Sequence, residues 1–429
     1  MHSLLASDRM EEVEGKGWDG MQKVRFIHTA DLHLDSPLVG MNQLPEAIFE
    51  QVQESTFQSF ERIVDKALAE KVDFIIIAGD IYDQHERSLK AQLYFKKQMS
   101  RLDEHNIPVY IIHGNHDFTG GSSLHVELPS NVHVFSDEKV ERKTFVKDGV
   151  PLVNLYGYSY PKRAVTENMS RYYVKRGDAP FHIGLLHGTV AGDSEHEPYC
   201  PFRVQDLTEK GFDYWALGHI HKRQLLHNEE TVILYPGNIQ GRHRKEQGEK
   251  GAYLIELTKA GADLQFFSTA PIFFTEKEIS LDQYETFSDF IDGMMKVKSE
   301  LKELHDRVFY TLRFVGVTHL YQHFVKEDVM EDFMELMNEG ETGQVFSWLM
   351  KVENEAMPVD VHLWKEESFF TTDLQSVLEH YDMEAALQPL MKHATVRKEL
   401  SSFSEEEKQQ ILKEAQLLLF HEWLKSNVK

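Results

Sequence analysis

The first part of the chain alternates short apolar runs with longer stretches of helical periodicity. The apolar runs at 24–29, 74–78 and 109–112 have the length of buried strands. Between them, residues 55–70 and 88–104 place apolar side chains three and four positions apart, which predicts amphipathic helices. This alternation predicts an α/β fold built on a largely parallel sheet.

Further along the chain, strand-like runs become denser and helical runs fewer. This change predicts a second sheet packed on the first, with the helices outside. The strands expected in this part are 152–158, 183–186, 214–217, 232–235, 252–256 and 264–268.

The pattern changes again near Pro271. Two strand-like runs, 273–280 and 308–317, flank a helical run at 287–304, and residues 319–365 have a mostly helical, acidic pattern. The predicted domains are an N-terminal extension (1–20), a core domain (21–269), a small α+β capping domain (270–365) and C-terminal helices (366–429).

Five of the predicted strands end in polar clusters. Groups that follow the carboxyl ends of parallel strands meet on one rim of a sheet, which is where α/β proteins bind ligands. The clusters are Asp31 with His33, Asp80 with Asp83, Asn115 with His116 and Asp117, His187, and His219 with His221.

Each cluster taken alone has an ordinary explanation. A carboxylate such as Asp80, at the end of a buried run, is costly unless it is paired or binds a metal, but it also caps helices. Asn115 offers a neutral oxygen and His116 a proton donor, yet a simple Gly-Asn turn uses the same residues. All the clusters together are hard to obtain by chance, and they predict a metal site with oxygen and imidazole ligands.

Composition narrows the class of protein. The 429 residues are enough for two or three domains, and the single cysteine, Cys200, excludes a disulfide framework and favours a reducing, cytoplasmic compartment. No apolar stretch has the length of a membrane span, so no membrane partner is expected. The formal net charge of −24 argues against binding of polyanions, although divalent cations can reverse the local field at a site.

The motifs as a set resemble those of the calcineurin-like metallophosphoesterases, over roughly residues 22–257. Within that superfamily the chain is most similar to bacterial DNA-repair exonucleases of the SbcD type, and the run from Tyr235 to Gly241 suggests a YhaO-like branch. The resemblance implies a four-layer α/β/β/α sandwich. The matching motifs are Asp31-x-His33, Gly79-Asp80-x-x-Asp83, Gly114-Asn115-His116-Asp117, His187-Gly188 and Gly218-His219-x-His221.

The resemblance also implies roles for these residues around two metal ions, expected to be Mn²⁺. Asp80 would bridge the ions, His116 would be the catalytic acid, and Asp117 would orient His116, while Asp83 would position a histidine. One ion would be held by Asp31, His33, Asp80 and His221, and the other by Asp80, Asn115, His187 and His219.

The implied function is a Mn²⁺-dependent DNA exonuclease or endonuclease that hydrolyses phosphodiester bonds in double-strand-break repair or end processing. Two alternatives stay open: a phosphodiesterase for small molecules such as cyclic nucleotides, and an assembly subunit of an ATPase complex. Retention of every ligand position argues against a purely structural role.

Two protein partners are expected. Resemblance implies a coiled-coil, SMC-like ATPase of the SbcC type, and the wide apolar stripe of the last helix, Ile411 to Leu419, would suit such a contact, although a core helix would show the same stripe. A homodimer is expected through the helices near 55–70 and 88–105, with Leu93, Tyr94 and Met99 on the contact face.

Several other polar residues have less specific surroundings in the sequence. His28 and His113 are expected to be buried with satisfied hydrogen bonds, and His85 to be exposed. The basic runs Lys222-Arg223 and Arg242-His-Arg244-Lys245 are suited to follow a nucleic-acid backbone, but solvated loops have the same composition.

Overall fold

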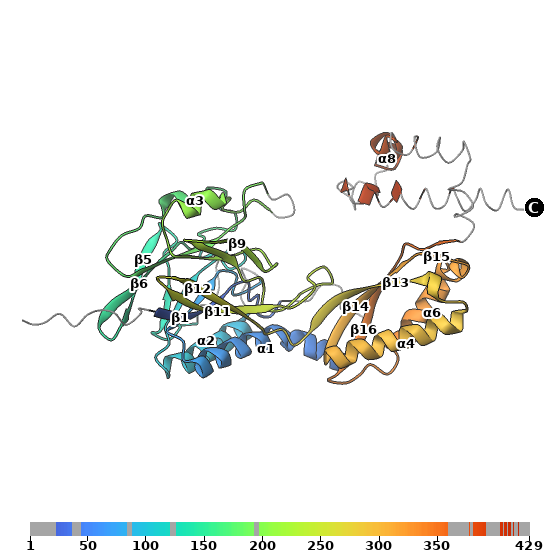
Figure 1. The fold of residues 1–429 in the computed structure, drawn as a ribbon, viewed down its shortest axis with the longest axis horizontal. Coiled ribbons are helices and arrows are strands. Elements are labelled where there is room, and N and C mark those ends of the chain that lie inside the picture. Colours follow the sequence, from blue (N-terminus) through green and yellow to red (C-terminus); the bar gives the residue numbers. More distant parts are fainter. Residues whose placement is uncertain are drawn as a thin grey trace, which may run out of the picture. The chain divides into compact units, whose positions relative to one another are not determined.

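The computed structural model describes residues 23–36, 44–83, 88–120, 126–192 and 197–358, together with 381–391 and scattered positions between 377 and 419 (Figure 1). Its strands are β1 (Lys23–Thr29), β2 (Phe74–Ala78), β3 (Val109–Ile112), β4 (Val132–Val134), β5 (Glu141–Lys147), β6 (Val150–Gly157), β7 (Phe181–His187), β8 (Tyr214–Gly218), β9 (Gln224–Asn228), β10 (Val232–Tyr235), β11 (Gly251–Thr258), β12 (Gly261–Ser268), β13 (Phe273–Ser280), β14 (Arg307–Val315), β15 (Val317–Thr318), β16 (Phe346–Asn354) and β17 (Met357–Pro358). Its helices are α1 (Glu46–Glu70), α2 (Leu89–Asp103), η1 (Met169–Tyr172), α3 (Val204–Thr208), η2 (Leu281–Gln283), α4 (Phe287–Leu304), α5 (Tyr321–Phe324), α6 (Glu327–Asn338) and α8 (Met383–Met391).

Two six-stranded sheets form the centre of the first part of the chain. The strand orders are β12-β11-β1-β2-β3-β4 and β5-β6-β7-β8-β10-β9. Strands β1 to β4 run parallel, as do β6, β7, β8 and β10, while β11 and β12 in the first sheet and β5 and β9 in the second pair antiparallel. The two parallel sets therefore present their carboxyl ends as continuous rims.

The sheets pack face to face through an apolar layer. Phe26 and Phe74 of the first sheet lie in one buried cluster with Leu155, Ile183 and Tyr214 of the second. Both faces of the central strands are thus covered, which explains why these strands read as continuous apolar runs rather than alternating ones.

Helices cover the two outer faces unequally. On the first sheet, α1 and α2 lie side by side (Figure 1) and bury Phe57, Phe60 and Phe95 against strand residues such as Ile75. The second sheet is covered by the short η1 and α3 around Trp215. The structure is the α/β/β/α sandwich expected from the sequence, with a thin second helical layer.

Most predicted elements are present with bounds within a few residues. The helix expected at 55–70 begins earlier, at Glu46, because Ile48 and Val52 extend its buried stripe onto Ile272 and Phe274. Strands β4, β5 and β9 were not predicted. Each lies at a sheet edge, and β5 begins with three charged residues, Glu141, Arg142 and Lys143, in place of an apolar run.

The chain then forms a three-stranded sheet of order β13-β14-β16 and a two-stranded sheet of β15 and β17. Strand β13 and helix α4 have the bounds predicted from the sequence. The expectation that residues 319–365 are mostly helical is wrong for β16, which pairs with β14. Around this sheet, Phe290 packs edge to face on Phe314 and contacts Phe324 and Phe333.

The chain forms two compact units that interleave along the sequence. One contains Lys277–Lys296, Leu312–Met337 and the described residues after Met350, and the other contains the remaining described residues. Because the units interleave, the sequential domain boundaries given above stay a prediction. Most of the predicted C-terminal helices lie outside the described residues.

Candidate metal centre

The polar clusters predicted at five strand ends converge on the rims of the two facing sheets. They follow β1, β2 and β3 in one sheet and β7 and β8 in the other, and β2 faces β7 and β8 across the interface. Residues far apart in the sequence therefore meet because the carboxyl ends of both parallel sets lie at the same end of the sandwich.

The backbone at this rim has positive φ angles, which residues other than glycine rarely adopt. Asp31, His33, Asp80 and His219 have φ values of 52°, 43°, 52° and 99°. Each such residue costs on the order of 1–3 kcal/mol and persists only where the surroundings hold it. Here the Asp31 amide donates to the Gly79 carbonyl at 3.0 Å and the His33 amide to the Asp80 carbonyl at 3.0 Å, so two turns brace each other.

Glycines allow these turns to approach the imidazole of His187. A side chain at Gly79 would collide with that ring, and one at Gly218 would collide with the backbone of Ala78. A side chain at Gly114 would meet both His187 and the Asp80 carboxylate. The Gly-Asp, Gly-Asn and Gly-His pairs of the sequence are therefore requirements of close packing around the site.

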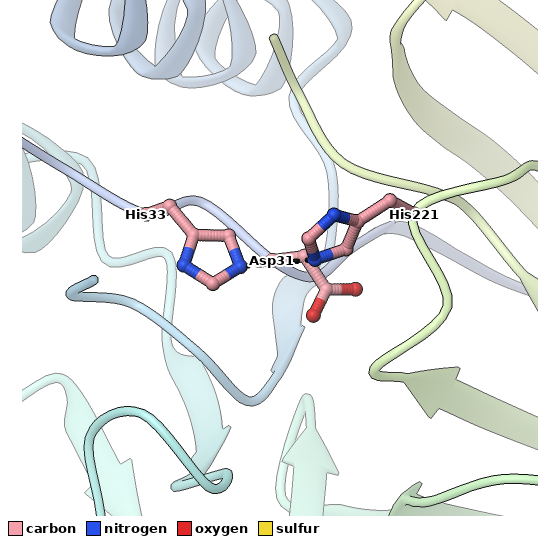
Figure 2. A group of neighbouring side chains, drawn as sticks. All are labelled: Asp31, His33 and His221. Atoms are coloured by element: carbon pink, nitrogen blue, oxygen red, sulfur yellow. Dashed lines mark hydrogen bonds between the residues drawn. The ribbon is translucent and has the colours of Figure 1, made fainter. Parts of the chain in front are cut away.

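Asp31, His33 and His221 form the first group of potential ligands (Figure 2). The two rings point toward each other, with Nε2 of His33 3.1 Å from Nε2 of His221. Nδ1 of His221 donates to the Glu246 carboxylate at 2.6 Å, so Nε2 of that ring carries a lone pair. A lone pair aimed at another imidazole nitrogen is the arrangement that a cation between them would stabilise.

Asp80, His187 and His219 form the second group, and Asn115 lies between its rings. Nδ1 of His187 donates to the Ala78 carbonyl at 2.9 Å, which directs Nε2 toward Asn115 Oδ1 at 3.0 Å and Asp80 Oδ2 at 3.4 Å. The other face of Asn115 Oδ1 lies 3.1 Å from Nδ1 of His219. All the predicted ligands are thus present in these two groups. A third group of potential ligands, His33 with Asp83 and His116, shares His33 with the first.

The charges of the site call for a cation. Asp31 and Asp80 are each only 1% exposed. Burial raises the pKa of Asp31 to about 8, and the Asp80 carboxylate acts in the same direction. Burial alone would lower the pKa of His187, yet Asp80 raises it to about 9, which means that the site favours positive charge there. Divalent ions would satisfy both carboxylates, and the mixed oxygen and imidazole donors fit such ions.

His116 lies beside the predicted ligands, and two hydrogen bonds fix its position. Its backbone amide donates to Asp80 Oδ1 at 3.0 Å, and its Nδ1 donates to the backbone carbonyl of Asp83 at 2.6 Å. The ring centroid is 5.0 Å from that of His33. Because Nδ1 is committed to a carbonyl, Nε2 is the nitrogen left to exchange a proton with a substrate.

Asp83 and Arg242 form an ion pair at the edge of the site. Asp83 also lies 3.1 Å from Nδ1 of His33, which agrees with the expectation that it positions a histidine. Arg242 lies in one of the basic runs predicted either to follow a nucleic-acid backbone or to form a solvated loop. Its side chain, 16% exposed and paired with Asp83, is not solvated, and contact of the run with nucleic acid stays a prediction. The predicted exposure of His85 concerns a residue outside the described part of the chain.

Asp117 contacts the turns that carry the ligands, and its role in orienting His116 stays a prediction. Its carboxylate accepts hydrogen bonds from the amides of Gly114 at 2.7 Å and Ile81 at 2.8 Å, and from Nδ1 of His113 at 3.1 Å. It therefore braces the turns that carry Asn115 and Asp80, while Nδ1 of His116 donates to the Asp83 carbonyl. The prediction that His28 and His113 are buried and hydrogen-bonded is confirmed, with His28 bound to Tyr214 and Leu217.

Sequence reasoning missed Glu246. Its Oε2 accepts from Asn238 and from the Arg242 amide, while Oε1 holds His221. Burial alone would raise the pKa of Glu246, but His221 lowers it below its ordinary value, so the carboxylate is charged. In the sequence, Glu246 is distinguished only by following the basic run Arg242-His-Arg244-Lys245, and this position does not by itself indicate a buried side chain.

Replacing Glu246 with glutamine should weaken metal binding. Carboxylate partners of ligating histidines fix the ring and raise its basicity, and their loss typically costs about 10–100-fold in affinity. We expect a shift of that size for Glu246→Gln in a Mn²⁺ titration followed by calorimetry. The exposed Glu249→Gln, from the same loop, is the matched control, and equal affinities for the two variants would contradict the role of Glu246.

Comparison with known proteins agrees with this geometry. The sequence model of the family described as calcineurin-like phosphoesterases matches residues 24–223. The chain is 40% identical over 395 residues to the "Uncharacterized metallophosphoesterase YhaO" of Bacillus subtilis, which covers 92% of this chain and 96% of that protein. It is 24% identical over 296 residues to the "DNA double-strand break repair protein Mre11" of Methanocaldococcus jannaschii, covering 64% of this chain and 74% of that one.

A solved structure of a dimetal phosphatase from Danio rerio covers 58% of this chain and 99% of its own, at 12% identity and a TM-score of 0.35, a likeness too weak to support an inference. The match to the family model, the match to YhaO and the two ligand groups agree with one another. The chain belongs to the calcineurin-like metallophosphoesterase family, whose members are phosphoester hydrolases that bind two divalent metal ions.

Proposed function

We propose that this protein is a Mn²⁺-dependent nuclease that hydrolyses phosphodiester bonds of DNA, in break repair or end processing. The observation that carries the proposal is the tethered His116 beside the two ligand groups. Hydrolysis of a DNA phosphodiester expels an alkoxide, which needs a proton, and a histidine placed next to the metal ligands can supply it. The similarity to Mre11 proteins supports DNA as the substrate.

Local charge supports the same substrate. The chain as a whole carries −24, yet basic residues flank the site on two segments. Lys222 and Arg223 follow the ligand His221, and Lys245 and Lys250 lie in the loop that carries Glu246. Cations beside the ligands attract a phosphate backbone to this rim even though the remaining surface repels it.

The residues of the chain have distinct tasks in the reaction. Two bound divalent ions would supply Lewis acidity, which lowers the pKa of a water and polarises the phosphoryl oxygens. Asp80 and its neighbours hold the ligand groups together, and buried backbone hydrogen bonds keep the turns rigid. His116 acts in its imidazolium form: Nδ1–H stays on the Asp83 carbonyl and Nε2 gives its proton to the leaving oxygen, which leaves a neutral imidazole.

Metal removal and replacement test the proposal. EDTA should abolish activity, Mn²⁺ should restore it, and Mg²⁺ should restore much less, because four of the seven potential ligands are imidazoles, whereas Mg²⁺ prefers oxygen donors and retains its waters. The substrates are linear duplex DNA, single-stranded DNA and bis(4-nitrophenyl) phosphate. Hydrolysis of the small diester without cleavage of any DNA would favour a small-molecule phosphodiesterase, and full activity in Mg²⁺ alone would refute the metal preference.

We also propose a homodimer through α1 and α2. Two leucines of α2 support it, since Leu89 is 53% and Leu93 51% exposed. Met99, expected on the contact face, is buried in the core, and Tyr94 is half-buried with its hydroxyl on the Phe57 carbonyl. Light scattering should give a dimer mass for the wild type and a monomer mass for Leu93→Glu, while Val146→Glu on β5 should stay dimeric. A monomeric wild type at micromolar concentration would rule the dimer out.

We further propose, from the sequence resemblance alone, that the protein binds a coiled-coil ATPase of the SbcC type. The stripe expected to bind it, Ile411 to Leu419, lies largely outside the described residues. Co-purification from a native extract, followed by identification of the bound chains, would test it. Recovery of the full-length protein without any ATPase would count against this partner.

A further inference from the structure

Arg223, named above only for its charge, belongs to a cluster with two aromatic rings close to the metal centre. The guanidinium carbon of Arg223 lies 3.8 Å from the centroid of the Phe266 ring. The ring of Tyr253 meets Phe266 edge to face, with centroids 5.5 Å apart and planes at 65°. Arg223 is exposed and both rings are half-buried. We call these three residues the Arg223 platform.

The fold fixes the platform beside the ligands. Arg223 follows the ligand His221 by two residues, and a side chain at Gly237 would come within 2.9 Å of the His221 carbonyl and 3.0 Å of the Arg223 amide, so the loop after β10 is pressed against this segment. Tyr253 pairs with Phe266 on β12 and, on its other side, with His28 on β1, the strand that leads to the ligand turn.

The distance between the platform and the ligands suits a short stretch of nucleic acid. Lys250 donates from Nζ to the His221 carbonyl at 2.9 Å, and Tyr253 lies three residues further along the chain. Three residues of strand span about 10 Å, one strand spacing adds about 5 Å, and the Lys250 side chain separates its backbone from His221, so Phe266 lies on the order of 10–20 Å from the ligand turn. A polynucleotide with one phosphate at the metals can reach the platform with a base a few nucleotides away.

Arg223 has no ion-pair partner in the part of the chain that the structure describes. Within the described residues no carboxylate lies at ion-pair distance from its guanidinium, whereas Arg242, on the adjacent loop, is paired with Asp83. Arg223 therefore presents a planar, positively charged face over an aromatic ring at the rim. That combination attracts a phosphate backbone and also accepts the flat face of a base.

We infer that the Arg223 platform stacks an unpaired nucleobase of the substrate strand and so directs single-stranded DNA ends to the metal centre. The inference rests on the proposed nuclease function and specifies the form of DNA that the site takes. Bases inside a duplex are stacked on their neighbours, so only an unpaired or terminal base can offer its face to the platform. Every base has such a face, so the preference is for strand state and not for sequence.

Binding without cleavage is the direct test. Full-length protein is freed of divalent ions with EDTA and titrated into a fluorescein-labelled oligo(dT), and the affinity is read from anisotropy. Loss of stacking on one residue typically weakens binding by about 10-fold. We expect a loss of that size for Phe266→Leu and for Arg223→Gln. Arg223→Lys should also lose affinity, since a lysine keeps the charge but not the plane.

Two matched controls separate stacking from charge and from folding. Phe267→Leu changes the neighbouring ring, which packs on the opposite face of β12 against the helical core, and should bind oligo(dT) as the wild type does. An abasic strand of the same length keeps the phosphates without bases. It should bind the wild type more weakly than oligo(dT) and should not distinguish Phe266→Leu from the wild type.

The outcomes are distinct. Equal oligo(dT) affinities for wild type, Phe266→Leu and Phe267→Leu, each with a cooperative thermal melt, would overturn the platform while leaving the nuclease proposal intact. Equal losses on oligo(dT) and on the abasic strand would show a charge effect only and would also overturn it. A wild type that hydrolyses bis(4-nitrophenyl) phosphate but neither binds nor cleaves DNA would instead overturn the nuclease function itself.

Discussion

Replacing Asp80 with asparagine should reduce phosphodiester hydrolysis on the order of a thousand-fold. Asp80 is the carboxylate that lies between the two ligand groups, with its Oδ2 3.4 Å from Nε2 of His187 and 3.9 Å from Nε2 of His33. Loss of its charge weakens both ion sites at once, and metal ions supply several kcal/mol of transition-state stabilisation. The measurements are the rate with saturating Mn²⁺ and the number of ions retained after gel filtration.

The variant is expected to fold. Asparagine has the size of aspartate and keeps an oxygen for the His116 amide, which now donates to Asp80 Oδ1 at 3.0 Å. Burial alone would raise the pKa of Asp80, but His187 holds it well below its ordinary value, so the Asp80 carboxylate stabilises the metal-free protein. The metal-free variant should therefore melt cooperatively, at a lower temperature than the wild type. Asp103→Asn, at the end of α2, is the control. If Asp80→Asn retained two ions and a wild-type rate, Asp80 would not bridge them.

Replacing His116 with glutamine should leave both ions in place and lower turnover on DNA by about 10²–10⁴-fold. Its amide contacts the Asp80 carboxylate and its Nδ1 contacts the Asp83 carbonyl. The groups of Asp31, His33 and His221 and of Asp80, His187 and His219 do not include it. A positioned general acid contributes a factor of this size. The measurements are Mn²⁺ stoichiometry by calorimetry and single-turnover rates on a DNA strand.

The leaving group provides an internal control for this role. 4-Nitrophenolate needs no proton to depart, so the defect of His116→Gln should be much smaller on bis(4-nitrophenyl) phosphate than on DNA. A general loss of structure or metal would reduce both rates alike. Fewer than two bound ions in His116→Gln would make His116 a ligand, and equal defects on the two substrates would remove its role as the acid.

Much of the fold could be predicted because its central strands are buried on both faces. Such strands appear as unbroken apolar runs, and β2, β3 and β10 have the bounds that their sequences predict. Edge strands such as β5 and β9 carry no such run, because one face or one edge meets water. Strand β16 escaped prediction because polar Ser347, Lys351 and Glu353 interrupt its apolar residues, so it shows no continuous apolar run.

The sequence by itself determined the ligand types and their common rim. Polar residues after parallel strands can only collect at the carboxyl ends of those strands, so Asp31, Asp80, Asn115, His187 and His219 were placed together by chain order and strand direction. The glycines beside them were visible too, although only the packed structure shows that they make room for the His187 ring.

The tertiary structure decided the partners of these ligands. Glu246 holds His221, Arg242 pairs with Asp83, and Asp117 braces two turns through backbone amides. None of these contacts follows from a repeating pattern, because each depends on how an irregular loop closes over the rim and on which side chain it buries there. Local periodicity reports which face of an element is buried, whereas contacts between distant loops form only when the whole sandwich is assembled.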